Sequence, residues 1–232
     1  MKKEFREYHS PSSGIFFASS MRIFYAESPY QKIEIIAHPY FGKVLLLDGL
    51  VQTTEKDEFF YHEMLAHPAM TVHPDPKDVL IIGGGDGGVL KEVLRYPVQS
   101  VYLVEIDAQV VEATRTHFPW LNRCLKDNRT RVVMEDGRAF LRKTDQRFDV
   151  ILVDSSDPVG PSRVLHRKDF YERLKQGLAP GGIACVQLGS PVYQLKAILR
   201  REARFIEIFR LVYLYTAPVP TYPGGLWCYG FL

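Results

Sequence analysis

The 232-residue sequence contains few cysteines, and none of them is spaced as a metal-binding or redox pair. Cys124, Cys185 and Cys228 are scattered, and pairing any two would leave one over, so we expect reduced thiols in a cytoplasmic protein. The chain also lacks the run of about 20 apolar residues that a membrane-spanning helix needs. Polar residues follow Met1 directly, so we expect no secretory signal peptide.

Charge of one sign is not concentrated anywhere in the chain. Lysine and arginine together number 29, aspartate and glutamate 27, and the formal net charge is +2. No cluster of basic residues is suited to a phosphate backbone or to anionic lipid. We therefore expect neither a nucleic-acid partner nor a membrane partner.

The most informative stretch covers residues 78–88. A short apolar run is followed at once by glycines, and then by apolar residues at helical spacing over 89–96. Strand, glycine turn and helix form the entry to a nucleotide-binding α/β unit. The pattern G-x-G-x-x-G, which alone says little about the nucleotide, is met by Gly83, Gly85 and Gly88. Asp86 is unusual, because it places a carboxylate in the loop that faces a pyrophosphate in dinucleotide enzymes.

Strands and helices alternate after residue 78. We expect strands at 78–82, 101–105, 131–134, 148–153 and 183–187, two further strands at 211–215 and 227–232, and helices at 89–96, 108–116, 138–143 and 168–178. This alternation predicts an α/β fold with a doubly wound, mostly parallel, Rossmann-like sheet of the methyltransferase type.

Residues 1–72 are expected to form a small N-terminal β-rich domain, and residues 73–232 the Rossmann-like catalytic domain. Short β-type runs cover 14–18, 22–27 and 31–37. Asp48-Gly49 separates two apolar runs over 43–53 and predicts a hairpin, because this pair tolerates the positive φ angles of a type I′ turn. A helix is expected over 57–70, and His73-Pro74-Asp75-Pro76 ends it and marks the domain boundary.

Acidic residues follow four successive strands of the expected sheet. They are Asp86, Glu105 with Asp107, Glu135 with Asp136, and Asp154 with Asp157. Because ligands of open parallel sheets bind beyond the carboxyl ends of the strands, we expect these acids to converge on one rim. A phosphate at that rim would meet acids instead of donors, so the ligand should be uncharged or cationic.

Each of these acids also has a plainer interpretation, because acids at strand ends often cap a helix or a turn. Glu105 is favoured as functional, since it lies about 20 residues past the glycines, where a carboxylate binds ribose hydroxyls. Asp154 and Asp157 lie in a proline-stiffened loop. Their Asp-x-x-Asp spacing could instead hold Mg²⁺ through oxygen ligands, although no phosphate-bearing substrate is indicated.

Taken together, the motifs resemble the polyamine aminopropyltransferase family, of which spermidine synthase is the commonest member. The matching segments are YQKIEI at 30–35, LDG at 47–49, QTTEKDE at 52–58, YHEM at 61–64, GGGDGG at 83–88, VEID at 104–107, DG at 136–137, DSSDPVGP at 154–161 and PTYPGG at 220–225. They occur in the family's order and cover nearly the whole chain. Their combination is far more specific than the glycine pattern alone.

The resemblance implies transfer of an aminopropyl group from decarboxylated S-adenosylmethionine, a co-substrate, to a diamine, usually putrescine, with release of methylthioadenosine. It implies no cofactor and no metal, and a homodimer or homotetramer. By the same resemblance, the donor is bound by Gln31, Asp86, Glu105, Asp136, Gly137 and Pro161. Asp154 is the expected general base. The amine is expected to contact Glu7, Tyr61, His62, Asp86, Asp154, Asp157 and Tyr222.

The chemistry of these residues agrees with the implied roles. The donor has lost its carboxylate and presents an ammonium, which suits Asp86, whereas the carboxylate of S-adenosylmethionine would be repelled. The acceptor must attack as a free amine although its pKa is about 10, so a carboxylate that takes up its proton is needed. Neighbouring acids can raise the pKa of that carboxylate towards neutrality.

Two departures from the family pattern concern the ends of the chain. The family usually has a tryptophan just before the acid matched to Glu7, where this sequence has Glu4-Phe5-Arg6. Members also usually continue through a further helix and strand, so this chain, which stops at Leu232, is either a natural short form or truncated. The alternatives left open are an S-adenosylmethionine-dependent methyltransferase, a nicotinamide dehydrogenase, and a noncatalytic nucleoside- or polyamine-binding protein of the same fold.

Overall fold

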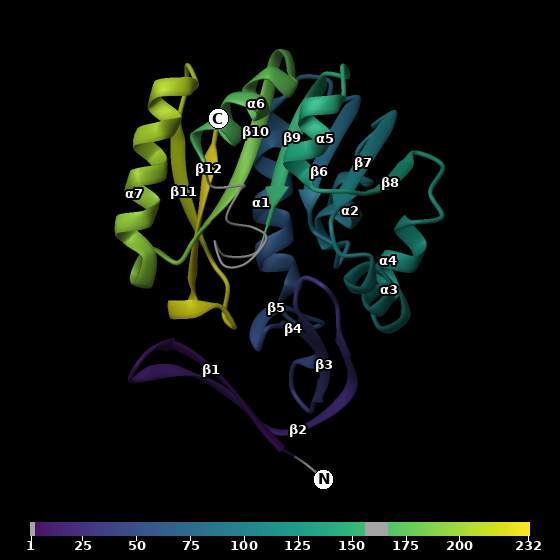
Figure 1. Cartoon of the computed structure of the whole chain (residues 1–232), viewed down its shortest axis with the longest axis vertical. Helices are drawn as coiled ribbons and strands as arrows, with labels where there is room; N and C mark the ends of the chain where they lie inside the picture. The colour runs from purple at the N-terminus through teal and green to yellow at the C-terminus, as the bar shows by residue number, and fades with distance from the viewer. Residues whose placement is uncertain (1–2, 156–166) are drawn as a thin grey trace.

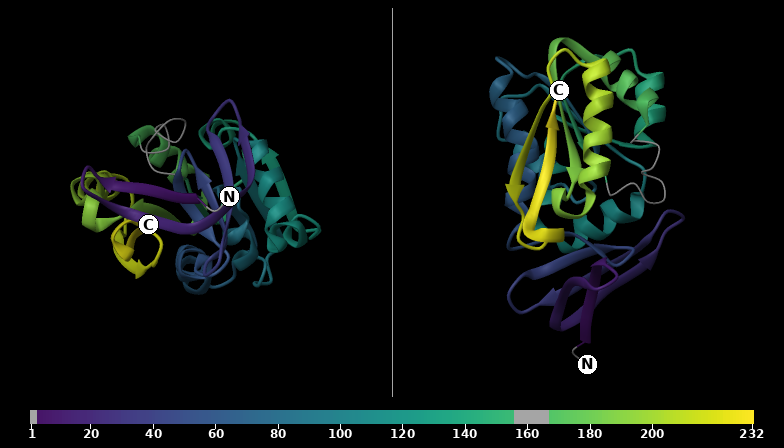
Figure 2. Two further views of the ribbon diagram at one scale, coloured as in Figure 1. Left: turned by 90° about the horizontal axis from the view of Figure 1, so that it is seen from below. Right: turned by 90° about the vertical axis from the view of Figure 1, so that its left-hand side faces the viewer.

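The computed structural model describes residues 3–155 and 167–232, which form two β-sheets and their helices (Figure 1). A five-stranded antiparallel sheet comes from the N-terminal part of the chain, and a seven-stranded sheet from the rest. Figure 1 and the right-hand view of Figure 2 place the smaller sheet across one end of the larger one. The site described below lies where these two parts meet.

The larger sheet has the order β11-β12-β10-β9-β6-β7-β8. Its strands are β6 (Asp78–Gly83), β7 (Ser100–Glu105), β8 (Thr130–Met134), β9 (Phe148–Asp154), β10 (Leu178–Gly189), β11 (Tyr213–Pro218) and β12 (Leu226–Phe231). The five strands from β6 to β10 run parallel, and β12 and β11 are added antiparallel at one edge. The predicted doubly wound, mostly parallel sheet is confirmed. After β6 the chain adds β7 and β8 on one side of this strand and then crosses to the other side to form β9 and β10. Ligands of such sheets usually bind at this switch point, between β6 and β9.

Alternate residues of the buried strands face opposite helical layers. On β6, Val79 and Ile81 belong to the cluster that packs against α1 (Glu58–Val72), α2 (Gly88–Val93) and α4 (Pro119–Cys124). Leu80 and Ile82 belong to the cluster that packs against α5 (Gly137–Lys143), α6 (Lys168–Gly177) and α7 (Pro191–Ile208). The period of two along a strand therefore explains why the central strands are apolar throughout.

The N-terminal sheet consists of β1 (Lys3–Ser10), β2 (Ser13–Glu27), β3 (Lys32–His38), β4 (Gly42–Leu47) and β5 (Leu50–Thr54), paired in chain order. The hairpin predicted at Asp48-Gly49 is confirmed, with φ angles of 51° and 81° at these residues. The separate runs expected at 14–18 and 22–27 are wrong in detail, because they form the single strand β2. Strand β1 was not predicted; its polar residues become a strand by pairing with β2.

Helix α1 connects the two parts of the fold. It buries Leu65, Ala66, Ala69 and Met70, and it packs against α2 and β10 of the larger unit. The domain boundary expected at residue 73 stays a prediction, and by its contacts this helix lies with the larger sheet. Among the described residues, no helix combines the length and the apolar character that a membrane crossing requires.

Helix α7 was missed in the sequence, although a signal for it is present. Its buried residues Ile198, Arg201, Phe205 and Ile208 recur at intervals of three and four, and Pro191 stands at its first turn. Helix α3 (Ala108–His117), by contrast, was expected, and it contributes Val110 and Ala113 to the contact with the N-terminal sheet.

Candidate active site

A cavity of about 310 Å³ lies between the carboxyl ends of the parallel strands and the N-terminal sheet. Nine residues predicted from the sequence line it: Glu7, Gln31, Tyr61, Asp86, Glu105, Asp136, Gly137, Asp154 and Tyr222. His62 does not line it. Asp157 and Pro161 lie outside the described residues, so their predicted roles stay predictions. Three of the strand-end acids thus meet Asp86 in one cavity, as the parallel sheet requires.

The glycine loop brings Asp86 close to the end of β9. Gly83 has a φ angle of 81°, and the Gly84 amide donates to the Asp154 carbonyl at 2.9 Å. A Cβ atom at Gly83 would collide with that carbonyl oxygen, so only glycine permits this approach. The loop and the end of β9 are therefore held together by backbone contacts.

Asp154 ends β9 and lines the cavity. The Tyr61 hydroxyl donates to its Oδ1 at 2.6 Å. Burial raises the pKa of Asp154 to about 6, and the neighbouring charge of Asp86 contributes to this rise. A carboxylate with such a pKa can accept a proton near neutral pH and release it again.

His62 contacts Asp86 and does not itself line the cavity. The Asp86 Oδ1 accepts from the Gly88 amide at 2.9 Å, and its Oδ2 lies 3.1 Å from His62 Nε2. His62 Nδ1 lies 2.6 Å from Glu58 Oε2, and its side chain is 1 % exposed. The ring contacts Asp86 and does not line the cavity, and the expected contact of His62 with the amine stays a prediction. A Cβ at Gly88 would collide with this ring, which accounts for the third glycine of the motif.

The charges of this group depend on one another. Burial opposes a charge on His62, but Asp86 and Glu58 outweigh it and raise the pKa of His62 to about 10. Burial likewise opposes the charge of Asp86, but His62 lowers its pKa below the ordinary value. Asp86 is therefore ionised beside a protonated imidazole at neutral pH.

Glu105 ends β7, which pairs with β6 on the side opposite to β9 and Asp154. Its Oε1 accepts from the Asp107 amide at 2.9 Å, and burial raises its pKa to about 7. Asp107 was not assigned a role in the sequence, yet its Oδ2 accepts from the Gln31 side-chain amide at 3.0 Å. This contact joins the N-terminal sheet to the larger sheet at the cavity.

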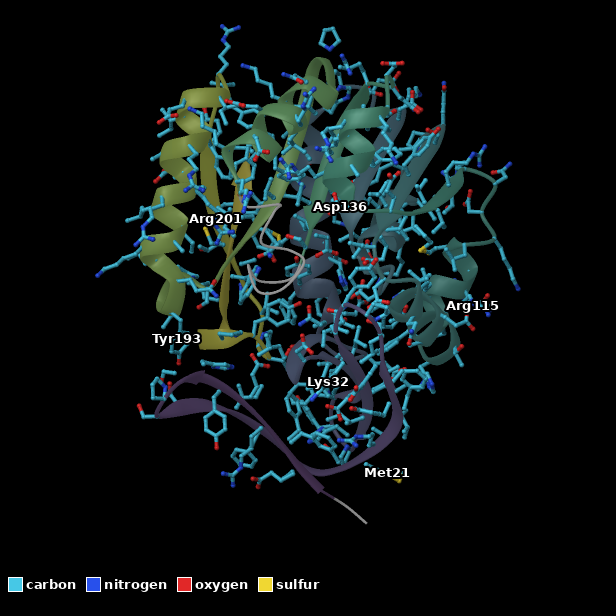
Figure 3. All side chains as sticks on the ribbon, viewed as in Figure 1. Met21, Lys32, Arg115, Asp136, Tyr193 and Arg201 are labelled. Atoms are coloured by element: carbon cyan, nitrogen blue, oxygen red, sulfur yellow. The ribbon has the colours of Figure 1, made fainter. Side chains whose placement is uncertain are left out.

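Asp136 follows β8 and caps α5, because its Oδ1 accepts from the Ala139 amide at 2.8 Å. Figure 3 shows Asp136 near the middle of the molecule, and the residue lines the cavity together with Gly137. The plainer capping interpretation therefore holds for Asp136 and is compatible with a place in the site.

Two family models match the chain. One, described as the spermine/spermidine synthase domain, matches residues 58–232, and the other, described as the spermidine synthase tetramerisation domain, matches residues 5–55. The chain belongs to the spermine/spermidine synthase family. It is accordingly a transferase of the polyamine aminopropyltransferase class.

Relatives and solved structures agree with this assignment. The chain is 41 % identical to a polyamine aminopropyltransferase of Moorella thermoacetica over 97 % of its length and 80 % of the relative's. It is also 41 % identical to polyamine aminopropyltransferase 1 of Aquifex aeolicus, with the same coverage. A spermidine synthase structure from Thermotoga maritima matches with a TM-score of 0.93 and 38 % identity over 99 % of this chain and 78 % of that chain. A spermidine synthase in complex with the transition-state analogue AdoDATO matches with a TM-score of 0.95, 38 % identity, and 99 % and 79 % coverage.

The transferase positions Tyr222 through an aspartate that sequence reasoning did not single out. Asp57 is buried before α1, and its Oδ2 accepts from the Thr221 amide at 3.0 Å and from the Thr221 hydroxyl at 2.8 Å. Its Oδ1 accepts from the Thr54 hydroxyl at 2.6 Å. The Tyr222 hydroxyl in turn donates to the Gln52 carbonyl. The C-terminal loop is therefore held on the N-terminal sheet at the cavity.

Replacement of Asp57 by alanine is expected to lower the free energy of unfolding by about 3 kcal/mol, because it leaves buried donors without an acceptor. The measurement is urea denaturation followed by circular dichroism. Asp75→Ala, at an exposed aspartate, is the control and should change the free energy little. An Asp57→Ala protein as stable as the parent would show that the hydrogen bonds of Asp57 do not hold the C-terminal loop in place.

The acid cluster also has the composition of a metal site. Ligand atoms of His62, Asp86 and Asp154 lie within 4.8 Å of one another. Both ring nitrogens of His62 lie beside carboxylates, those of Glu58 and Asp86, and these acids raise the pKa of His62 to about 10. The expectation that the site holds no metal stays a prediction.

Proposed function

We propose that this transferase moves the aminopropyl group of decarboxylated S-adenosylmethionine to a diamine, most simply putrescine, giving spermidine and methylthioadenosine. The observation that carries the proposal is the charge of the cavity wall. Five of the described residues that line it carry a carboxylate, namely Glu7, Asp86, Glu105, Asp136 and Asp154. None of the described lining residues is lysine or arginine. A wall of this kind favours cationic amines over phosphates and carboxylates.

Donor choice is proposed to depend on Asp86. Its carboxylate is ionised and fixed in the glycine loop, where the ammonium of the decarboxylated donor can pair with it. The intact amino acid end of S-adenosylmethionine would bring a carboxylate to the same place, which disfavours a methyltransferase. Glu105 is proposed to accept hydrogen bonds from the ribose hydroxyls, with Gln31, Asp136 and Gly137 at the remaining nucleoside contacts.

Asp154 is proposed to be the general base. The amine nitrogen forms a bond to the carbon beside the sulfonium, the carbon–sulfur bond breaks, and methylthioadenosine leaves as a neutral thioether. The proton lost by the nitrogen passes to Asp154, which Tyr61 holds in place. Alignment of the two substrates and exclusion of water supply most of the remaining acceleration.

No metal and no organic cofactor is needed in this proposal, since the sulfonium is itself the leaving group. We also propose that the enzyme works in the cytoplasm, which the three buried free cysteines support. A homodimer or homotetramer is supported by the match of residues 5–55 to a tetramerisation domain. Large apolar side chains of the same sheet are exposed, namely Tyr8, Phe16 and Met21.

The direct test is release of methylthioadenosine from decarboxylated S-adenosylmethionine, with putrescine, cadaverine, agmatine and spermidine supplied separately. S-adenosylmethionine serves as the parallel donor. Release that depends on one amine would support the reaction and name the acceptor. No release with any amine from a folded protein would refute the proposal, and methyl transfer from the parallel donor would favour the methyltransferase alternative.

The acid limb of the pH profile tests the proposed base. We expect kcat at saturating donor and amine to fall as the pH is lowered through about 6, because Asp154 then becomes protonated. An ordinary aspartate would remain a base down to about pH 4. Glu105→Gln removes the group whose pKa is raised to about 7, so the limb that remains in this variant belongs to Asp154. A limb near pH 4 in both proteins would argue against Asp154.

A further inference from the structure

A buried chain of alternating charges runs from the surface to Asp86. The Lys91 ammonium donates to Glu58 Oε1, and the other oxygen of Glu58 lies 2.6 Å from His62 Nδ1. The opposite nitrogen of His62 faces Asp86 at 3.1 Å. Among the described residues, Glu58 is absent from the lining of the cavity, and it contacts His62, which contacts Asp86. No substrate role has been assigned to it.

The chain lies beside two carboxylates that compete for one proton. Asp86 and Asp154 each have an oxygen within 4.8 Å of the other and of a His62 nitrogen. Two carboxylates this close do not both ionise readily unless a positive charge stabilises one of them. His62 lies against Asp86, whereas the group bonded to Asp154 is the neutral hydroxyl of Tyr61. The environments of the two acids therefore differ in charge.

We propose that Glu58 is a positioning residue that holds His62 charged and oriented, so that Asp86 stays ionised for the donor's ammonium while Asp154 takes up the proton. The inference rests on the proposed function, which assigns the donor's ammonium to Asp86 and the proton of the amine to Asp154. The pKa directions agree with it, since that of Asp86 is lowered and that of Asp154 is raised. Pairs of acids whose environments separate their pKa values are those that divide catalytic roles.

The groups that face His62 come from every element packed around it. They are Glu58 and Tyr61 on α1, Asp86 in the glycine loop, Asp154 at the end of β9, and, through Glu58, Lys91 on α2. Glu58 and Asp86 act directly on the ring from its two sides. Removing the charge of Glu58 should therefore let His62 lose its proton at a lower pH.

Glu58→Gln is the first test, because the amide keeps the shape of the side chain and removes its charge. We expect His62, followed by NMR of the imidazole nitrogens, to lose its proton at a pH lower by about one unit or more. At a pH between the pKa of His62 in the variant and that in the parent, where only the parent's imidazole is charged, the KM for the donor should rise about tenfold, while kcat and the KM for the amine change little. Glu63→Gln on the same helix, at a side chain 42 % exposed, is the matched control and should leave all these values unchanged.

His62→Gln is the second test and removes the positive charge at every pH. The two carboxylates then interact without it, and the acid limb of kcat should move upward from about pH 6 by about one unit, because loss of a neighbouring cation raises a carboxylate pKa. A merely structural histidine would lower the rate without moving the limb. An unmoved limb in His62→Gln would overturn the inference, and so would an unchanged donor KM in a folded Glu58→Gln protein at a pH where only the parent's His62 is charged. A parent enzyme that releases no methylthioadenosine would instead refute the proposed function, and the NMR measurement would still report on the charge of His62.

Discussion

Asparagine in place of Asp154 is expected to lower kcat by about 10²–10⁴, because an amide cannot take up the proton that the attacking amine must lose. The amide oxygen can still accept the hydrogen bond that Tyr61 donates at 2.6 Å, so the wall of the cavity should keep its shape. The measurement is methylthioadenosine release at saturating donor and amine. Calorimetry with methylthioadenosine should give an affinity close to that of the parent, which separates loss of chemistry from loss of folding.

Asp145→Asn is the control for this prediction, since Asp145 is exposed in the loop before β9. That variant should keep the parent's kcat. A kcat of Asp154→Asn within a few-fold of the parent would remove Asp154 from the role of base. The residue that takes up the proton would then have to be sought among the other carboxylates of the cavity.

Asparagine in place of Asp86 is expected to raise the KM for decarboxylated S-adenosylmethionine about a hundredfold, because the donor's ammonium loses its charged partner in a buried site. The change also leaves the protonated His62 with Glu58 as its remaining acidic hydrogen-bond partner. Selectivity against S-adenosylmethionine should fall at the same time, since an amide does not repel its carboxylate. The affinities of both donors can be measured by calorimetry in the absence of amine.

The ratio of the two donor affinities makes this test independent of stability. A partly unfolded protein would bind both donors less well and leave the ratio unchanged. Asp75→Asn, at a side chain 68 % exposed, supplies the matched control. Unchanged affinity for both donors in Asp86→Asn would show that the donor's ammonium is bound elsewhere.

Much of the site follows from the sequence because a parallel sheet has a fixed polarity. Residues that end successive parallel strands must lie along one edge, so the convergence of Asp86, Glu105, Asp136 and Asp154 could be predicted. Tyr61, Tyr222 and Glu7 belong to elements outside that rule. They were expected only from the resemblance to the family, and the structure brings all three to the cavity.

Other features could not be predicted from the sequence alone. Asp57 and Thr221 lie far apart in the sequence, and nothing in the local pattern of either residue indicates their hydrogen bond. Strand β1 carries no apolar alternation of its own and becomes a strand only by pairing with β2. The helical spacing of α7, by contrast, was available and was overlooked.

The sequence by itself determined the alternation of strands and helices, the type I′ hairpin at Asp48-Gly49 and the acidic rim of the sheet. Periodicity and turn chemistry act over a few residues, and the acidic rim follows once the strands are known to run parallel. Only the tertiary structure decided that His62 lies behind Asp86, with Glu58 and Lys91 behind it. The ionisation of a buried carboxylate depends on charges a few ångströms away in space, whichever part of the chain supplies them.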